Sequence, residues 1–299
     1  MAEDRGAPGA RKADAGSGTA GKLWRLETAP YPVREPLPTR LEGLPPLPAA
    51  YRDTLRLGLP AIRGANFSDA QLEALDEHVR LLVAWNAAIN LSGIRDPAAM
   101  AREHVLDSLT ALPILRRAGV TEFLDLGSGS GYPGLPLAIT LPATRALLVE
   151  SIGKKARFLA VVAEGLGLSD RVRVAATRAE TLAADPHNRG RWPAVVARAV
   201  SDLTELAELS LPLLVVGGAL VAWKKSTQDG ELDDAERALP SLGGRVAARE
   251  SVAVPGLEDH VLLVVEKVAQ TPSEFPRDPA TRRSRPLGRA AAGGPGRAG

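Results

Sequence analysis

The chain has 299 residues, 45% of them hydrophobic, with 37 basic residues against 35 acidic ones, a balance that is ordinary for a globular protein. It contains no cysteine, so disulfides, iron–sulfur clusters, thiolate zinc sites and a cysteine nucleophile are excluded. No apolar run approaches the roughly 18 residues of a membrane span. The first residues also lack the apolar core of a secretory signal, so we expect a cytoplasmic protein that does not enter a membrane.

Both ends of the chain differ in composition from its middle. Residues 1–55 are rich in Gly, Ala, Arg and Pro without a sustained periodicity, which predicts a disordered extension. Residues 271–299 hold six arginines against two acids, a net charge of +4, whereas the remainder of the chain carries −2. We predict a basic C-terminal tail over these residues, which either contacts a polyanion or stays solvated.

The first regular elements are helices. Ser68 and Gln71 have the spacing of a capping box, and the apolar residues that follow them recur at helical spacing. A second helix is predicted to begin with Asp96 as its N-cap and Pro97 in its first turn, and to run towards residue 112. We expect residues 56–120 to form a small helical cap.

One face of this second helix carries His104, Asp107 and Ser108, at positions i, i+3 and i+4. A catalytic triad is one hypothesis for these residues. The favoured hypothesis is a pair on the helix surface, or a buffer against a substrate cleft, without a catalytic role. The four histidines of the chain show no spacing typical of metal ligands, so no metal site is predicted.

From residue 121 the pattern changes to strands that alternate with helices. The first four predicted strands are short continuous apolar runs, as in strands buried on both faces of a parallel sheet. The predicted strands span residues 122–126, 146–150, 171–175, 194–198, 219–223, 245–254 and 260–268. Only "PGLED" separates the last two, which predicts an antiparallel hairpin at a sheet edge.

Seven strands with this terminal hairpin favour one fold class. They fit the class I, Rossmann-like methyltransferase sheet better than the six-stranded sheet of a dehydrogenase. We therefore predict an α/β domain over residues 121–270, with a mostly parallel sheet. In open α/β sheets, ligands bind outside the carboxyl ends of the strands, so the site is expected there.

A glycine-rich loop follows the first predicted strand, in the stretch "FLDLGSGSGYPGLP" at residues 123–136. A P-loop is excluded because no Gly-Lys-Ser/Thr follows the glycines. The glycines from Gly129 onwards match the dinucleotide pattern G-x-G-x-x-G, but a single match of this kind is weak. Counted from Gly127, the loop reads G-x-G-x-G behind Asp125, which is the arrangement that cradles S-adenosylmethionine.

The charge of the ligand favours the second interpretation. S-adenosylmethionine is cationic at its ammonium and sulfonium groups, so a carboxylate at Asp125 would attract it and would repel a pyrophosphate. Glu150, at the end of the second predicted strand, is placed to accept hydrogen bonds from ribose hydroxyls. We predict S-adenosyl-L-methionine as the cofactor, with contacts from Asp125, Gly127, Gly129 and Glu150.

Residue types and motifs that the sequence lacks exclude some classes of methyl-group acceptor. Methylation of a pyrimidine carbon uses a cysteine, which is absent. Methylation of an exocyclic base nitrogen commonly uses an Asn/Asp-Pro-Pro-aromatic tetrad after the fourth strand, where this chain has "VVARAVSDL". An acceptor with an available lone pair, such as N7 of guanine, needs positioning rather than a base, so no catalytic residue is predicted. Elimination of this kind favours guanine N7 and leaves other acceptors open.

Seven motifs occur together over about residues 68–287: "WNAAINLSGI", "HVLDSL", "DLGSGSGYPGLPLAI", "LVESIGKKARFL", "RAE", "VVARAVSDLTEL" and "FPRDPATRRSRPL". Together they resemble the ribosomal RNA small-subunit methyltransferase G family, also called the glucose-inhibited division protein B family. The "GYPG" extension and the "ARAV" after strand four are the most specific parts of this resemblance. It implies methylation of guanine N7 in 16S rRNA, with rRNA or the small ribosomal subunit as the partner of a monomeric enzyme.

The resemblance also implies roles for individual residues. It places cofactor contacts at Gly127, Tyr132, Ala179, Glu180 and Arg198. Because Arg198 ends a buried parallel strand, we expect it to face the cleft and to orient cofactor and guanine, with a salt bridge to a neighbouring helix as the alternative. Lys224 and Arg277 are expected to contact the rRNA substrate.

The chain departs from the family in two segments. Strand five ends in Trp-Lys-Lys where Lys-Gly is usual, and the closing segment carries Arg282, Arg283 and Arg285 where Gly and Lys are usual. Phosphate contacts tolerate such an exchange better than base contacts would. Two other functions stay open, an NAD-dependent oxidoreductase and a non-catalytic RNA-binding protein on the same fold.

Overall fold

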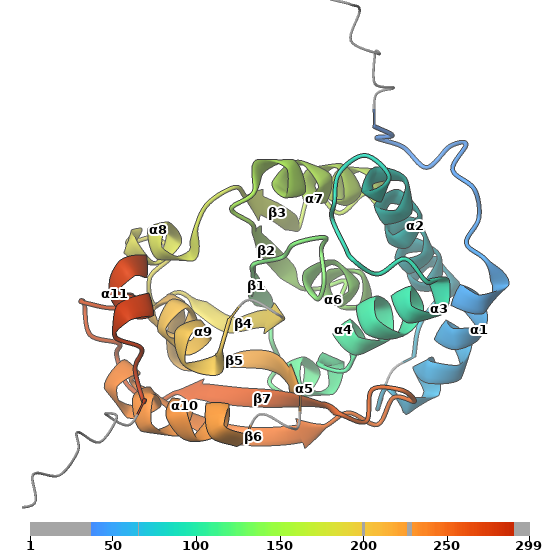
Figure 1. Cartoon of the computed structure of the whole chain (residues 1–299). Coiled ribbons are helices and arrows are strands. Elements are labelled where there is room, and N and C mark those ends of the chain that lie inside the picture. Colours follow the sequence, from blue (N-terminus) through green and yellow to red (C-terminus); the bar gives the residue numbers. More distant parts are fainter. Residues whose placement is uncertain (1–36, 65, 199–200, 226–228, 290–299) are drawn as a thin grey trace, which may run out of the picture. The chain divides into compact units, whose positions relative to one another are not determined.

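The computed structural model of the chain describes residues 37–64, 66–198, 201–225 and 229–289. In this part, seven strands form one sheet in the order β3-β2-β1-β4-β5-β7-β6 (Figure 1). The strands are β1 (Glu122–Leu126), β2 (Arg145–Val149), β3 (Val172–Ala175), β4 (Trp192–Arg198), β5 (Leu214–Lys225), β6 (Gly244–Ser251) and β7 (His260–Lys267).

The direction of the strands confirms the predicted fold class. Strands β1 to β5 pair in parallel, whereas β7 pairs antiparallel with both β5 and β6. The predicted terminal hairpin therefore exists, and β6 lies at the edge of the sheet. Strand β5 begins earlier than predicted, at Leu214, and β6 ends earlier, at Ser251.

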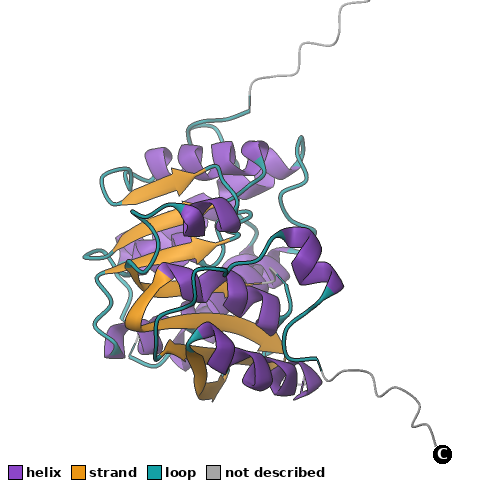
Figure 2. Cartoon of the chain, turned by 90° about the vertical axis from the view of Figure 1, so that its left-hand side faces the viewer, coloured by secondary structure: helices purple, strands orange, loops and turns teal. Residues whose placement is uncertain are grey.

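Helices cover both faces of this sheet (Figure 2). Because side chains alternate along a strand, neighbouring residues of β1 enter different cores: Phe123 packs with helices α2, α6 and α7, and Leu124 packs with α8, α9 and α10. The described helices are α1 (Ala49–Gly58), η1 (Leu59–Ala61), α2 (Asp69–Asn86), α3 (Pro97–Ala99), η2 (Met100–Leu106), α4 (Asp107–Leu109), α5 (Leu112–Arg117), α6 (Gly134–Thr140), α7 (Gly153–Gly165), α8 (Ala179–Ala184), α9 (Leu203–Ser210), η3 (Leu211–Leu213), α10 (Asp229–Leu242) and α11 (Pro279–Ser284). None of them is long and apolar enough to cross a membrane.

The predicted helix starts are confirmed. The Ser68 side chain accepts from the Gln71 amide and the Gln71 side chain accepts from the Ser68 amide, which completes the capping box. Asp96 caps the second helix by accepting from the Ala99 amide at 2.8 Å. That helix changes to π-helical geometry over Met100–Leu106, a distortion that is frequent at functional sites.

Both predicted end segments need correction where the structure describes them. Most of the predicted extension 1–55 lies outside the described residues, but α1 falls inside its last part, and Tyr51 of α1 is fully buried. The boundary near residue 55 was therefore too late. The apolar spacing of Tyr51 and Leu55 was the signal, and the surrounding prolines masked it. In the described part of the C-terminal segment, residues 271–289, helix α11 and the buried Arg282 show that this part is packed against the protein, whereas Arg283 and Arg285 are exposed.

Candidate active site

The glycine loop joins β1 to α6 at the carboxyl end of the sheet. Gly127 and Ser128 donate backbone hydrogen bonds to the Val149 carbonyl at 2.9 and 3.0 Å, so the loop turns back over the end of β2. Gly131 has φ +94°, and a Cβ there would lie 2.4 Å from the Leu135 side chain. Only glycine fits this position, which explains the third glycine of the motif on structural grounds.

Asp125 lies beneath this loop and is fully buried. Its Oδ2 accepts a hydrogen bond from the Gly134 amide at 3.0 Å, and burial raises the pKa of its carboxyl to about 7. It lines neither of the two cavities described below. The structure therefore places Asp125 as the residue that fixes the loop, rather than at the surface where the sequence argument expected a cation to lie.

Glu150 is the carboxylate that the structure does bring to the cavity surface. It follows the last residue of β2, and its two oxygens accept from the Gly129 amide at 2.9 Å and the Ile152 amide at 2.7 Å. These bonds hold the acid in a single orientation between the glycine loop and the start of α7. Gly129 thus contributes to the site through its backbone amide, which helps to orient Glu150.

A cavity of about 220 Å³ opens beside this acid. It gathers residues from the ends of β1 and β2 and from helices α8, α9 and α11. Four of the predicted cofactor residues line it, together with two that the sequence argument did not place there: Gly127, Glu150, Ala179 and Glu180, with Glu205 and Arg282. Of these, the backbone at Gly127 is in the left-handed region, with φ +74°.

Tyr132, for which the resemblance implied a cofactor contact, is not among the residues that line the two cavities. Its ring is stacked between His78 and His104, at centroid distances of 4.5 and 4.4 Å. Burial lowers the pKa of His78 to about 4 and that of His104 to about 3, so both imidazoles are neutral at physiological pH. The stack packs Tyr132 of the glycine loop against α2 and η2 of the helical cap. Because His104, Asp107 and Ser108 are all buried, they do not form the expected pair on the helix surface.

For Arg198, at the end of β4, the sequence left two alternatives, a position facing the cleft and a salt bridge to a neighbouring helix, and the structure shows both. It lines a larger cavity of about 620 Å³, and it also forms an ion pair with Asp107 of α4, with Nη1 2.9 Å from Oδ2. The same guanidinium donates to the Glu103 carbonyl at 2.5 Å in the π-helical stretch. The expected position at the cleft and the expected alternative of a salt bridge are therefore both present.

Asp107 connects this arginine to a histidine that the sequence gave no reason to select. His260 Nδ1 lies 3.0 Å from Asp107 Oδ1, and this hydrogen bond is the main cause that raises the pKa of His260. The Trp223 indole donates to the Asp107 carbonyl at 2.8 Å. The two members of the Asp–His pair are 153 residues apart in the chain, so no local pattern could have found them.

The two residues predicted to contact rRNA lie in different surroundings. Lys224 lines the larger cavity and donates to Glu231 Oε1 at 2.5 Å and to the Ser201 carbonyl at 2.7 Å. Arg277 lines neither cavity described here, and its guanidinium donates from Nε and Nη2 to the two oxygens of Glu208, at 2.9 and 2.7 Å. Glu208 is almost fully buried. Arg277 is therefore placed in a structural ion pair.

The two cavities share Ser201 and lie at the carboxyl ends of the parallel strands, as the fold class predicts. The smaller cavity is below the roughly 300–1,000 Å³ of a typical ligand pocket. Among residues that the structure describes, no cluster of three or more His, Cys, Asp or Glu side chains could hold a metal ion.

Comparison with known proteins identifies the family. Residues 71–259 match the family described as rRNA small subunit methyltransferase G. The chain belongs to this family. The ribosomal RNA small subunit methyltransferase G of Chloroflexus aggregans is 43% identical over 224 residues, which cover 75% of this chain and 93% of that protein.

Further members of the methyltransferase G family show the same extent of similarity. The proteins of the same name from Dehalococcoides mccartyi and Streptococcus pyogenes are 41% and 36% identical, and cover 74% and 75% of this chain and 93% and 94% of their own. Among solved structures, Aeropyrum pernix fibrillarin is 17% identical with a TM-score of 0.39, over 48% of this chain and 66% of that chain. The family predicted from the sequence motifs is thus confirmed by the sequence relatives.

Proposed function

We propose that this protein transfers a methyl group from S-adenosyl-L-methionine to N7 of a guanine in 16S rRNA. The observation that carries this proposal is membership of the methyltransferase G family, combined with two adjoining cavities at the strand ends. Family membership confirms the predicted enzyme class and cofactor, and it does not favour an NAD-dependent oxidoreductase or a non-catalytic RNA-binding protein.

The charges of the residues that line the smaller cavity suit a cationic S-adenosyl compound. The walls of this cavity carry three carboxylates, from Glu150, Glu180 and Glu205, against the two guanidinium groups of Arg178 and Arg282. An excess of negative charge suits a cationic nucleoside and disfavours a pyrophosphate. Glu150 would hold the ribose, and the backbone at Gly127 allows close approach of the ligand. When bound, the cofactor supplies an electrophilic methyl group on its sulfonium.

The larger cavity is the place for the acceptor base. Arg198 and its partner Asp107 both line this cavity, and their ion pair holds the guanidinium in one orientation. A fixed guanidinium can orient an incoming base without moving a proton, which agrees with a reaction in which the ring nitrogen attacks with its own lone pair. Lys224 lines the same cavity, but its side chain is only 11% exposed and its ammonium is paired with Glu231, so it could contact RNA phosphates only if this ion pair opened.

The assembly state and the form of the substrate are further parts of this proposal. We propose that the enzyme acts as a monomer. We propose that it acts in the cytoplasm on 16S rRNA, either free or in the small ribosomal subunit, and that the basic residues beyond the sheet attract this polyanion.

Purified protein, a radiolabelled methyl donor and small-subunit rRNA test the proposal. Nuclease mapping is expected to place the label on one guanine. Substitution of Gly127 is expected to weaken binding of S-adenosylmethionine, and substitution of Arg198 is expected to lower the rate of methyl transfer to rRNA. Label on a cytosine, on an adenine or on no nucleotide would contradict the assigned reaction.

A further inference from the structure

The C-terminal segment lies against the wall of the smaller cavity. Figure 1 shows α11 beside α8 and α9, two helices that are distant from it in sequence. The Arg189 guanidinium, from the loop before β4, holds the start of this segment by donating to three backbone carbonyls, those of Phe275, Thr271 and Pro272, at 2.8, 3.2 and 2.9 Å. The Asp278 side chain then caps α11 by accepting from the amides of residues 280 and 281.

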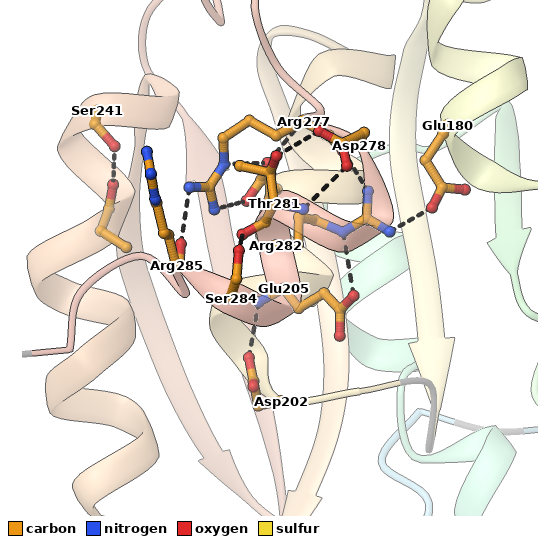
Figure 3. Close-up of polar contacts among 12 residues, drawn as sticks. Glu180, Asp202, Glu205, Ser241, Arg277, Asp278, Thr281, Arg282, Ser284 and Arg285 are labelled. Atoms are coloured by element: carbon orange, nitrogen blue, oxygen red, sulfur yellow. Dashed lines mark hydrogen bonds and ion pairs between the residues drawn. The ribbon is translucent and has the colours of Figure 1, made fainter.

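Arg282 is the residue of α11 that turns inwards. Its side chain is only 6% exposed, and all three of its nitrogens are engaged (Figure 3). Nε donates to Glu205 Oε1 at 3.1 Å, Nη1 donates to the Arg277 carbonyl at 2.6 Å, and Nη2 pairs with Glu180 Oε1. One planar fork therefore joins α11, α9 and α8.

This fork belongs to the cavity that we assign to the cofactor. Arg282, Glu180 and Glu205 all line it, and the start of α8 at Ala179 lines it as well. Burial by itself would raise the pKa of Glu180, but the hydrogen bond from Arg282 lowers it below its usual value. Arg282 thus keeps the carboxylate charged and in a fixed place on the cavity wall.

Loss of Arg282 would leave two neighbouring carboxylates, Glu180 and Glu205, without the guanidinium that joins them. Like charges at a half-buried surface repel, so both side chains would turn towards solvent and the wall at α8 would shift. Arg283, the next residue, is exposed and lines neither of the two cavities of the active site. The two adjacent arginines therefore have different surroundings.

We propose that Arg282 is a positioning residue of the cofactor site, and that α11 completes the wall against which the S-adenosyl nucleoside binds. This inference rests on the proposed function, since it takes the smaller cavity as the S-adenosylmethionine site. It replaces the sequence-based expectation that Arg282 contacts rRNA phosphates, because a buried, fully engaged guanidinium is not available to a polyanion. That role is left to Arg283 and its exposed neighbours.

The test compares the two adjacent arginines in the full-length enzyme. Binding of S-adenosylhomocysteine is measured by calorimetry for the wild type, Arg282→Ala, Arg282→Lys and Arg283→Ala, with rRNA affinity and the thermal midpoint measured in parallel. We expect Arg282→Ala to weaken S-adenosylhomocysteine binding by about 10- to 100-fold, since charged hydrogen bonds are lost on the cavity wall. Lysine cannot reproduce the three-way fork, so Arg282→Lys should give an intermediate loss.

Steady-state kinetics separate positioning from general destabilisation. The KM for S-adenosylmethionine should rise in Arg282→Lys while its KM for rRNA stays at the wild-type value, and Arg283→Ala should show the reverse. If Arg282→Ala does not fold, the folded Arg282→Lys variant decides the question. Wild-type cofactor affinity in a folded Arg282 variant, or a loss of rRNA affinity alone, would overturn the inference. If the wild type itself bound no S-adenosylhomocysteine, the proposed function would fail as well.

Discussion

Arg277→Ala tests whether Arg277 is a structural residue or an rRNA contact. The guanidinium donates to both oxygens of Glu208, at 2.9 and 2.7 Å, and the Glu208 side chain is 1% exposed. Truncation to alanine would remove both guanidinium donors from the buried Glu208 carboxylate. Residue 277 would then donate to Glu208 only through its backbone amide, at 2.8 Å. Removal of one partner from a buried ion pair costs about 3–5 kcal/mol. For a domain of 150–250 residues this corresponds to a thermal midpoint lowered by roughly 6–20 °C.

The assay is thermal unfolding followed by circular dichroism, with rRNA affinity measured on the same samples. The double variant Arg277→Ala with Glu208→Gln should recover part of the lost stability, because no unpaired charge then remains in the interior. Arg283→Ala is the control, since that side chain is exposed and should leave the midpoint unchanged. A midpoint within about 1 °C of the wild type together with weakened rRNA binding would refute the structural assignment and restore Arg277 as a substrate contact.

Two further outcomes are expected from the active site. Gly134→Ala should lower the free energy of unfolding in urea by about 1–3 kcal/mol, because its Cβ would lie 2.4 Å from Asp125 Oδ2. Gly153→Ala is the control and should be neutral, because its Cβ would meet no atom within 4 Å. Equal effects of the two substitutions would contradict the packing argument. For His260, the hydrogen bond to Asp107 raises the pKa from 6.5, so the stability that this pair adds is present below pH 6.5 and is lost as pH rises through the raised value. The difference in unfolding free energy between the wild type and His260→Gln should therefore shrink from pH 6 to higher pH, and a difference that grows would show that the sign is wrong.

Local patterns in the sequence were sufficient for the fold and for the family. The capping box at Ser68, the Asp96–Pro97 helix start and the buried parallel strands each depend on residues that are close together in the chain. The glycine loop and Glu150 were also accessible, because the ends of neighbouring parallel strands meet at one edge of a sheet.

Partnerships between distant residues could not be predicted in this way. Asp107 meets His260 across 153 residues, and Arg282 meets Glu180 across 102. Sequence alone did not distinguish Arg282 from Arg283, and only the packing of α11 buried Arg282 while Arg283 stayed exposed.

What the sequence by itself determined was therefore the class of fold, the family and the loop that turns over β2, because these depend on periodicity, turn chemistry and short spacing. The tertiary structure decided which charges are exposed to a ligand and which are neutralised inside the protein. Asp125 shows the difference, since its position at the end of β1 is local, but its burial beneath Gly134 depends on how α6 packs. Burial and pairing are set by side chains that arrive from elsewhere in the chain, and a linear pattern carries no information on them.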